Sequence, residues 1–192
     1  MLDPQGEVTS RFFEDAYQER NTVASVLVRL GSQVNVPATQ VTSPYLAITS
    51  YTTDQVAAPG TRLSVVLDIT PGENIHVYAP GVVGYRPIAL TLDAQPGVLI
   101  RSAQYPESED FYFEPLDEHV QVYQSPFRIV QDVTVDASRE GQAALDGAAS
   151  LTITGTLDYQ ACDDKICYNP QTVPLSWTIG LRSLDRERAL QR

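Results

Sequence analysis

The sequence predicts one all-β domain, a sandwich of eight or nine short strands, with a short fragment ahead of it. Apolar and polar residues alternate over most of positions 45–180, which is the pattern of strands that are buried on one face. Glycine and proline interrupt the alternation at regular spacing, and no helical period intervenes. With 192 residues, of which 43% are hydrophobic, the chain is long enough to bury one sizeable core.

The strands are expected in a regular series along this region. Their predicted ranges are 45–51, 63–69, 75–78, 88–92, 98–103, 120–123, 127–135, 151–157 and 173–179. Residues 136–149 are rich in Ala, Gly and Ser and are predicted to form a surface loop. Three consecutive aromatic residues at 111–113 lie among acidic residues between two prolines, which favours an aromatic loop over a core strand. The charged tail 181–192 is expected to fray or to form a short helix.

Residues 1–31 are predicted to form a β-hairpin followed by one amphipathic helix. Asp3–Gly6 is a turn sequence, and Asn21 can cap a helix that ends at Gly31. The apolar positions of this helix are Val23, Val26, Leu27 and Leu30. Because such a fragment cannot bury a core in isolation, it must pack on the sandwich or on an upstream domain. Residues 32–44 are polar, contain two prolines and show no helical period, so they are predicted to be a linker. The predicted organisation is therefore 1–31, 32–44, 45–180 and 181–192.

Net charge and hydropathy narrow the classes of partner. The formal net charge is −11, which disfavours nucleic acid and anionic membrane surfaces. No apolar run approaches the ~20 residues of a membrane span, so we expect no membrane insertion in this segment. The first residues, Met1–Pro4, lack the basic and apolar regions of a signal peptide. The chain is then either cytoplasmic or truncated, and the incomplete 1–31 fragment favours truncation.

The two cysteines of the chain, Cys162 and Cys167, lie in one short stretch between the last two predicted strands. A hairpin tip of four residues would place them opposite each other, where Cα atoms are about 4.5 Å apart and within reach of a disulfide. They could be a structural bridge, two buried thiols or a redox pair. The short loop offers little stabilisation as a bridge, and the charged tip is accessible, so redox use is favoured.

A metal site is a weaker alternative for the cysteines. His76 and His119 are distant from each other in sequence, so no second pair of ligands has the spacing of a zinc site. The only methionine is Met1, which disfavours a blue-copper centre. We therefore expect no metal and no other cofactor.

The stretch 159–170, Tyr-Gln-Ala-Cys-Asp-Asp-Lys-Ile-Cys-Tyr-Asn-Pro, followed by Thr-Val-Pro-Leu, resembles the active-site hairpin of the N-terminal domain of the thiol:disulfide interchange protein DsbD. The resemblance extends over about residues 44–180, and only the hairpin is specific. It implies an immunoglobulin-like β-sandwich that carries electrons through one reversible disulfide. It further implies exchange with thioredoxin-like partners, with Cys167 as the cysteine that a partner attacks first.

The resemblance also suggests residues around the disulfide. Family members carry a cap loop with an aromatic residue over the bond, and Asp110, Phe111 and Tyr112 match it, with Phe111 as the shield. His76 and Tyr78 match a strand that carries tyrosines near the active site. Packing under a loop and an ordinary structural histidine are the alternatives. From the residues alone, Asp163 and Asp164 beside Cys162 should hold the thiol pKa up, unless they are simply tip residues. Tyr168 flanks the pair on the other side.

Residues 2–22 resemble a second family. Leu-Asp-Pro-Gln-Gly-Glu-Val and Arg-Phe-Phe-Glu-Asp-Ala-Tyr-Gln-Glu-Arg-Asn-Thr are similar to the last hairpin and helix of a redoxin domain of the AhpC/TSA kind, which has a thioredoxin-like fold. This implies a redoxin joined to the DsbD-like domain and available as a partner in cis. A reversible disulfide and the family together indicate the periplasm or cell envelope.

The sequence thus predicts a thiol:disulfide oxidoreductase that relays electrons through Cys162 and Cys167. The alternative is a non-catalytic immunoglobulin-like interaction module with a structural disulfide. A metal-binding sandwich is the third hypothesis.

Overall fold

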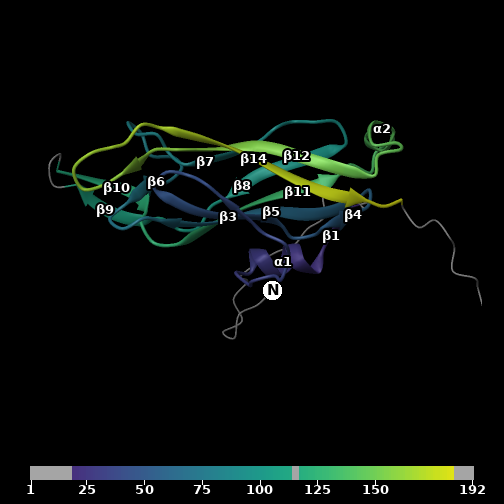
Figure 1. Ribbon diagram of the computed structural model, residues 1–192, viewed down its shortest axis with the longest axis horizontal. Coiled ribbons are helices and arrows are strands. Elements are labelled where there is room, and N and C mark those ends of the chain that lie inside the picture. Colours follow the sequence, from purple (N-terminus) through teal and green to yellow (C-terminus); the bar gives the residue numbers. More distant parts are fainter. Residues whose placement is uncertain (1–18, 114–116, 184–192) are drawn as a thin grey trace, which may run out of the picture.

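The computed structural model describes residues 19–113 and 117–183, which form an elongated, mostly β structure with three sheets (Figure 1). The largest sheet has the order β2-β3-β5-β11-β8, and β1 pairs with the start of β5 in parallel. Its strands are β1 (Arg20–Asn21), β2 (Thr39–Val41), β3 (Leu46–Thr52), β5 (Thr61–Pro71), β8 (Val98–Gln104) and β11 (Phe127–Val135). Apart from β1, all of its pairings are antiparallel.

The second sheet packs against the first and has the order β4-β14-β12-β7. Its strands are β4 (Val56–Ala57), β7 (Ala89–Leu92), β12 (Ser150–Tyr159) and β14 (Gln171–Leu181). The long hairpin of β12 and β14 is paired without interruption from Ser150↔Gly180 to Tyr159↔Gln171. Gly155 allows β7 to approach, because a Cβ there would lie 2.3 Å from the carbonyl oxygen of Thr91.

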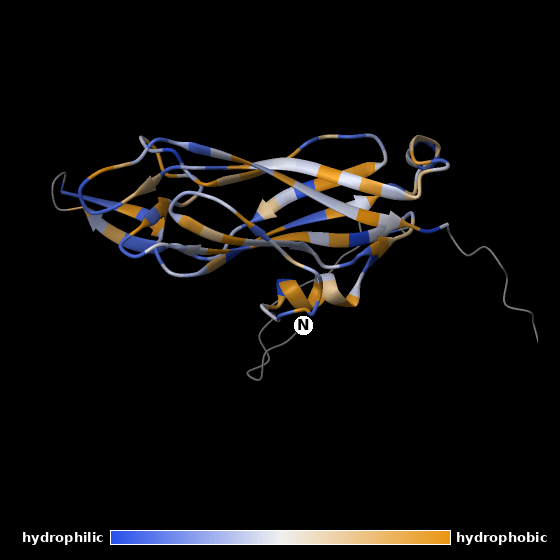
Figure 2. Cartoon of the chain, in the orientation of Figure 1, coloured by the Kyte–Doolittle hydropathy of each residue, from blue (hydrophilic) through white to orange (hydrophobic). Residues whose placement is uncertain are grey.

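The main core lies between these two sheets. Along β14, Val173, Leu175, Trp177 and Ile179 are buried while the residues between them are exposed. The same alternation of hydrophobic and hydrophilic positions is visible along the strands in Figure 2. One polar bond crosses the core, from the indole Nε1 of Trp177 to the hydroxyl of Ser50 at 2.7 Å. The alternation of apolar and polar residues that predicted a sandwich therefore corresponds to side chains that point alternately into the core and toward solvent.

A third, smaller sheet forms one end of the molecule (Figure 1). Its order is β13-β6-β10-β9, with β6 (His76–Tyr78), β9 (Glu109–Phe113), β10 (Glu118–Tyr123) and β13 (Ala161–Cys162). The aromatic stretch 111–113, which was predicted to be a loop, is in fact the strand β9. It forms a hairpin with β10, in which Phe111 lies opposite Val120. Pairing with a neighbouring strand outweighs the acidic composition that suggested a loop.

The described part of residues 1–31 packs on the outer face of the largest sheet. The helix α1 (Val23–Arg29) is capped by Thr22, whose side chain accepts a hydrogen bond from the backbone N–H of Ser25. The prediction of Asn21 as the cap was therefore wrong by one residue. The face of α1 toward the sheet contains Ser25 and Val28, whereas Val23 is 78% exposed. The predicted hairpin at the start of the chain lies outside the described residues.

Buried ion pairs attach this N-terminal segment to the sheet. Glu19 contacts Arg62 of β5 at 3.0 Å and Arg101 of β8 at 2.8 Å. Arg29 of α1 contacts Asp132 of β11 at 2.9 Å. These are charge-assisted bonds. Arg101 is 32% exposed, whereas the other charged side chains are at most 10% exposed and depend on their partners to compensate for lost hydration.

Two predicted irregular segments contain regular structure. Within 136–149, α2 (Arg139–Ala144) begins after Ser138, whose hydroxyl accepts from the N–H of Gly141 and supplies a cap that composition alone did not reveal. Within the linker 32–44, β2 pairs with β3. No helix among the described residues is long and apolar enough to cross a membrane.

Candidate functional site: a hairpin disulfide

Cys162 and Cys167 are joined by a disulfide at the end of the third sheet. The S–S distance is 2.05 Å, the Cα atoms are 4.0 Å apart, and the two residues form an antiparallel bridge, as the hairpin predicted. Cys162 is the last residue of β13, pairs with His76 of β6, and is only 1% exposed because it packs in a cluster with Tyr78, Val120 and Val122. Cys167 lies on the far side of the tip and is exposed. One sulfur-bearing residue is thus buried in the sheet, and the other faces solvent.

The loop between the cysteines is organised by Asp163. Its Oδ1 accepts hydrogen bonds from the backbone N–H groups of Lys165 and Ile166, each at 2.8 Å, and its Oδ2 accepts from the hydroxyl of Tyr168 at 2.7 Å. These bonds, that of Tyr168 above all, lower the pKa of the Asp163 carboxyl. Asp163 therefore acts as a tip residue that shapes the loop, while Asp164 is exposed beside it.

Tyr78 lies next to the exposed cysteine. Its hydroxyl is 3.6 Å from the Sγ atom of Cys167. Burial raises the pKa of Tyr78 to about 12, and the charge of Glu118 adds to this effect. The phenol is therefore neutral at pH 7 and can donate a weak hydrogen bond to sulfur.

His76 is buried between β9, which carries Phe111, and the hairpin that carries the two cysteines. Its ring lies 4.6 Å from that of Phe111 and 5.6 Å, edge-on, from that of Tyr78. Burial lowers the pKa of His76, while the carboxylates of Asp164 and Asp163 act in the opposite direction. Because the net direction is downward, the imidazole is neutral at pH 7.

Only one of the three predicted cap residues points toward the disulfide. Phe111 is half-buried and packs against the cluster of Tyr78, Val120, Val122 and Cys162. Asp110 and Tyr112 lie on the opposite, exposed face of β9, because side chains alternate along a strand. There Asp110 contacts His119 at 2.7 Å and the ring of Tyr112 lies 5.0 Å from that of His119.

Phe111 and the exposed cysteine border a small cleft of about 110 Å³. It is lined by His76, Tyr78, Tyr85, Phe111, Phe113, Val120, Asp163, Lys165, Ile166 and Cys167. Sequence reasoning missed Tyr85, whose ring stacks on Tyr78 at 4.1 Å and whose hydroxyl donates to Glu118. It also missed Tyr45, which stacks on Tyr168 at 4.1 Å. Neither residue lies in a motif, and the contacts of Tyr85 with Glu118 and of Tyr45 with Tyr168 join distant parts of the sequence.

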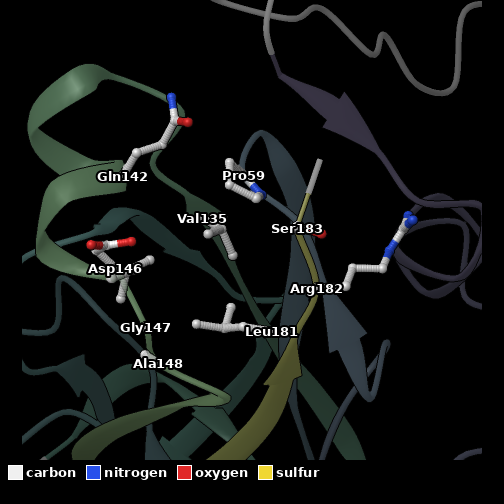
Figure 3. Close-up of a pocket in the computed structure, with 10 residues that line it drawn as sticks. Pro59, Val135, Gln142, Asp146, Gly147, Ala148, Leu181, Arg182 and Ser183 are labelled. Atoms are coloured by element: carbon white, nitrogen blue, oxygen red, sulfur yellow. The ribbon is translucent and has the colours of Figure 1, made fainter. Parts of the chain in front are cut away.

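A larger hollow of about 440 Å³ lies at the other end of the molecule, between α2 and the end of β14 (Figure 3). The apolar residues that line it include Pro59, Val135, Leu145 and Leu181, and the polar ones include Gln142, Asp146 and Arg182. The residues that line it within the described chain include no cysteine or histidine. Across 19–113 and 117–183, no group of three or more His, Cys, Asp or Glu residues is arranged to hold a metal ion.

The fold and the site define a β-sandwich domain with one disulfide at a surface hairpin. The family described as Thiol:disulfide interchange protein DsbD, N-terminal, matches residues 47–176. The chain belongs to this family, whose domains exchange electrons through a disulfide pair with thioredoxin-like partners. The mostly β, antiparallel architecture is consistent with the immunoglobulin-like fold of the family.

Two solved structures are similar to the chain at low sequence identity. The N-terminal periplasmic domain of ScsB from Proteus mirabilis has 11% identity and a TM-score of 0.48, and the match covers 71% of this chain and 49% of that one. This chain therefore spans about half of that structure. The DsbD N-terminal domain of Neisseria meningitidis in the reduced form has 13% identity and a TM-score of 0.40, over 61% of this chain and 81% of that one. No curated protein matches the sequence.

Proposed function

We propose that this domain relays electrons by opening and closing the Cys162–Cys167 disulfide in exchange with thioredoxin-like partners. The observation that carries the proposal is the asymmetry of the bond. Cys167 is exposed beside a cleft, whereas Cys162 is buried in the sheet. A disulfide with only a structural role would not need one of its cysteines to be exposed. The loop that it closes here has only four residues between the cysteines, so the bond contributes little to stability by restricting the unfolded chain.

The asymmetry assigns an order to the exchange. A partner thiolate attacks the Sγ of Cys167, the bond to Cys162 breaks, and Cys162 leaves as a thiolate that takes a proton from water. The partner's second thiolate then attacks the sulfur of the partner's first cysteine in the mixed disulfide, which forms the partner's own disulfide and releases Cys167 as a thiolate. The partner becomes oxidised by two electrons and this domain becomes reduced by two. Oxidation follows the same steps in reverse.

The surrounding residues suit this chemistry. The neutral phenol of Tyr78 can donate to the Cys167 thiolate when it forms, because their atoms are 3.6 Å apart in the oxidised state. The ring of Phe111 borders the approach to Cys167 and must move for a partner of protein size to reach the bond. Asp110 and Tyr112, on the other face of β9, support the strand that carries Phe111.

Redox cycling can be tested directly. The reduction potential measured against glutathione should lie above roughly −300 mV, whereas a structural disulfide in a non-catalytic module would lie below that value. In the Cys162→Ser variant, Cys167 should form a stable mixed disulfide with a thioredoxin-type protein. In the Cys167→Ser variant, the buried Cys162 should form none, and the opposite pattern would refute the order of attack.

The setting of the domain is a further part of the proposal. An accessible disulfide that must be re-formed suits an oxidising compartment, which supports the periplasm or cell envelope. We also propose that residues 1–31 continue from a redoxin domain, that 32–44 connect it to a domain over 45–180, and that 181–192 form a charged tail. The redoxin-like motifs of residues 2–22 support this arrangement. The reading frame ahead of Met1 tests it, and a frame without a thioredoxin-like domain would refute it.

A further inference from the structure

The disulfide is accompanied by non-covalent contacts that close the same hairpin. Asp163 follows Cys162, and Tyr168 follows Cys167. The Tyr168 hydroxyl donates to Asp163 at 2.7 Å, and the N–H of Tyr168 donates to the carbonyl of Ala161 at 2.8 Å. The N–H of Asp163 donates to the carbonyl of Ile166 at 2.9 Å. None of these bonds involves sulfur, so they can persist when the S–S bond opens.

The ring of Tyr168 is held in place from outside the hairpin. Tyr45 stacks on it with 4.1 Å between ring centroids and 18° between ring planes. Tyr45 adopts a left-handed backbone conformation with φ 67°, and its carbonyl accepts from the N–H of Gly72 at 2.9 Å. The preceding carbonyl, of Pro44, accepts from the hydroxyl of the buried Tyr159 at 2.5 Å. Tyr45 is therefore anchored to the sandwich and offers Tyr168 a fixed surface.

We propose that Asp163, Tyr168 and Tyr45 form a hairpin clasp that keeps the two sulfur atoms close together after the disulfide has opened. The inference rests on the proposed exchange function and concerns its rate. Two groups held in reacting geometry behave as if their mutual concentration were very high. The clasp supplies that geometry to Cys162 when it attacks a mixed disulfide on Cys167. Tyr168 and Tyr45 are positioning residues, because they contact neither sulfur nor partner in this step.

Glutathione provides a probe of this step. Oxidised glutathione reacts with the reduced domain, so that Cys167 becomes joined to one glutathione and the other leaves as a thiol. The thiolate of Cys162 then attacks the Sγ of Cys167, the Cys162–Cys167 bond forms, and the second glutathione leaves as a thiolate that is protonated by water. The rate of this second step reports the effective concentration of Cys162 at Cys167, and quenched-flow trapping with mass spectrometry measures it.

Three variants test the clasp. Tyr168→Phe removes the bond to Asp163 and keeps the stacked ring, and it should slow ring closure by about threefold to tenfold. Tyr45→Ala removes the stacked surface and should act in the same direction. Tyr45→Phe keeps it and should close at the wild-type rate. In the slow variants the reduction potential of the disulfide should rise, by about 30 mV for a tenfold decrease in the ring-closure rate.

A matched control removes a hydroxyl-to-carboxylate bond elsewhere. The hydroxyl of Thr154 on β12 donates to Asp93 at 2.7 Å, so Thr154→Val should leave ring closure unchanged. If Tyr168→Phe and Tyr45→Ala close as fast as the wild type, the clasp is refuted although the redox function stands. If the wild-type disulfide does not exchange with glutathione or dithiothreitol at all, the proposed function itself fails. Circular dichroism and urea unfolding confirm that each variant is folded before rates are compared.

Discussion

Replacement of Phe111 by alanine should make the disulfide open faster. Phe111 is half-buried, and full burial of a phenylalanine is worth about 1.5–3 kcal/mol, so the half-buried ring accounts for about 1 kcal/mol. Its contact with the ring of His76, 4.6 Å away, adds about 0.5–1 kcal/mol. If the ring must swing aside before a thiolate reaches the bond, removing it lowers the barrier by about 1.5–2 kcal/mol. Reduction should then be about tenfold to thirtyfold faster.

The assay is the pseudo-first-order rate of reduction by dithiothreitol, followed by alkylation and mass spectrometry. Two variants separate a shield from a general loosening. Tyr112 is adjacent on β9 but faces away from the disulfide, so Tyr112→Ala loosens the same strand without uncovering the bond. Leu99→Ala, on the distant β8, controls for loss of an exposed apolar side chain. A rate within twofold of wild type for Phe111→Ala would refute the shield, and an equal acceleration by Tyr112→Ala would assign the effect to strand loosening.

Three further predictions concern the surroundings of the site and the attachment of the N-terminal segment. Tyr78→Phe removes the hydroxyl that lies 3.6 Å from the Cys167 sulfur and can donate a hydrogen bond to its thiolate. The reduced domain should then react about threefold more slowly with iodoacetamide at pH 7. A faster reaction would contradict this hydrogen-bonding role. The pKa of His76 is lowered by burial, so its protonation favours the unfolded state. The contribution of His76 to the free energy of unfolding is therefore fully present above pH 6.5, the ordinary histidine pKa, and is lost as the pH drops below that value. In His76→Phe, the urea midpoint should fall less between pH 7.5 and pH 5 than in the wild type. An equal fall in both proteins would argue against this role of His76. Glu19→Ala removes the buried carboxylate that pairs with Arg62. It should lower the free energy of unfolding, measured by urea titration, by about 3 kcal/mol. A loss below about 0.5 kcal/mol would show that the pair contributes little to stability.

The strands were predictable where apolar alternation is bounded by turn residues. The expected range 127–135 coincides with β11, which lies between β5 and β8 in the largest sheet and is buried on both faces from Ile129 to Val135. The stretch 111–113, which was predicted to be a loop, is part of β9. Its residues alternate in exposure only because β10 pairs with them, and that partner is not visible in the composition of the segment.

The site was predictable to the extent that it is local. Cys162 and Cys167 are five positions apart, so hairpin geometry alone suggested their bond. His76 and Tyr78 were suggested by family resemblance, and the structure places them next to the pair. The contact of Tyr45 with Tyr168 spans 123 positions, and it depends on a left-handed backbone at a non-glycine residue. No short-range pattern predicts such a contact.

The attachment of β1 to the start of β5 has a consequence for how partners reach the disulfide. β1 pairs with Thr61 and Arg62, whereas the hairpin lies near the other end of β5, where Leu46 pairs with Pro71 (Figure 1). Ten residues of strand separate these points, which corresponds to about 33 Å. β14 likewise runs from the hairpin to the same distant pole. A domain tethered through β1 or through the end of β14 would have to span this length to reach the disulfide. A freely diffusing partner has no such constraint. Tether length would therefore set the local concentration of any partner in cis.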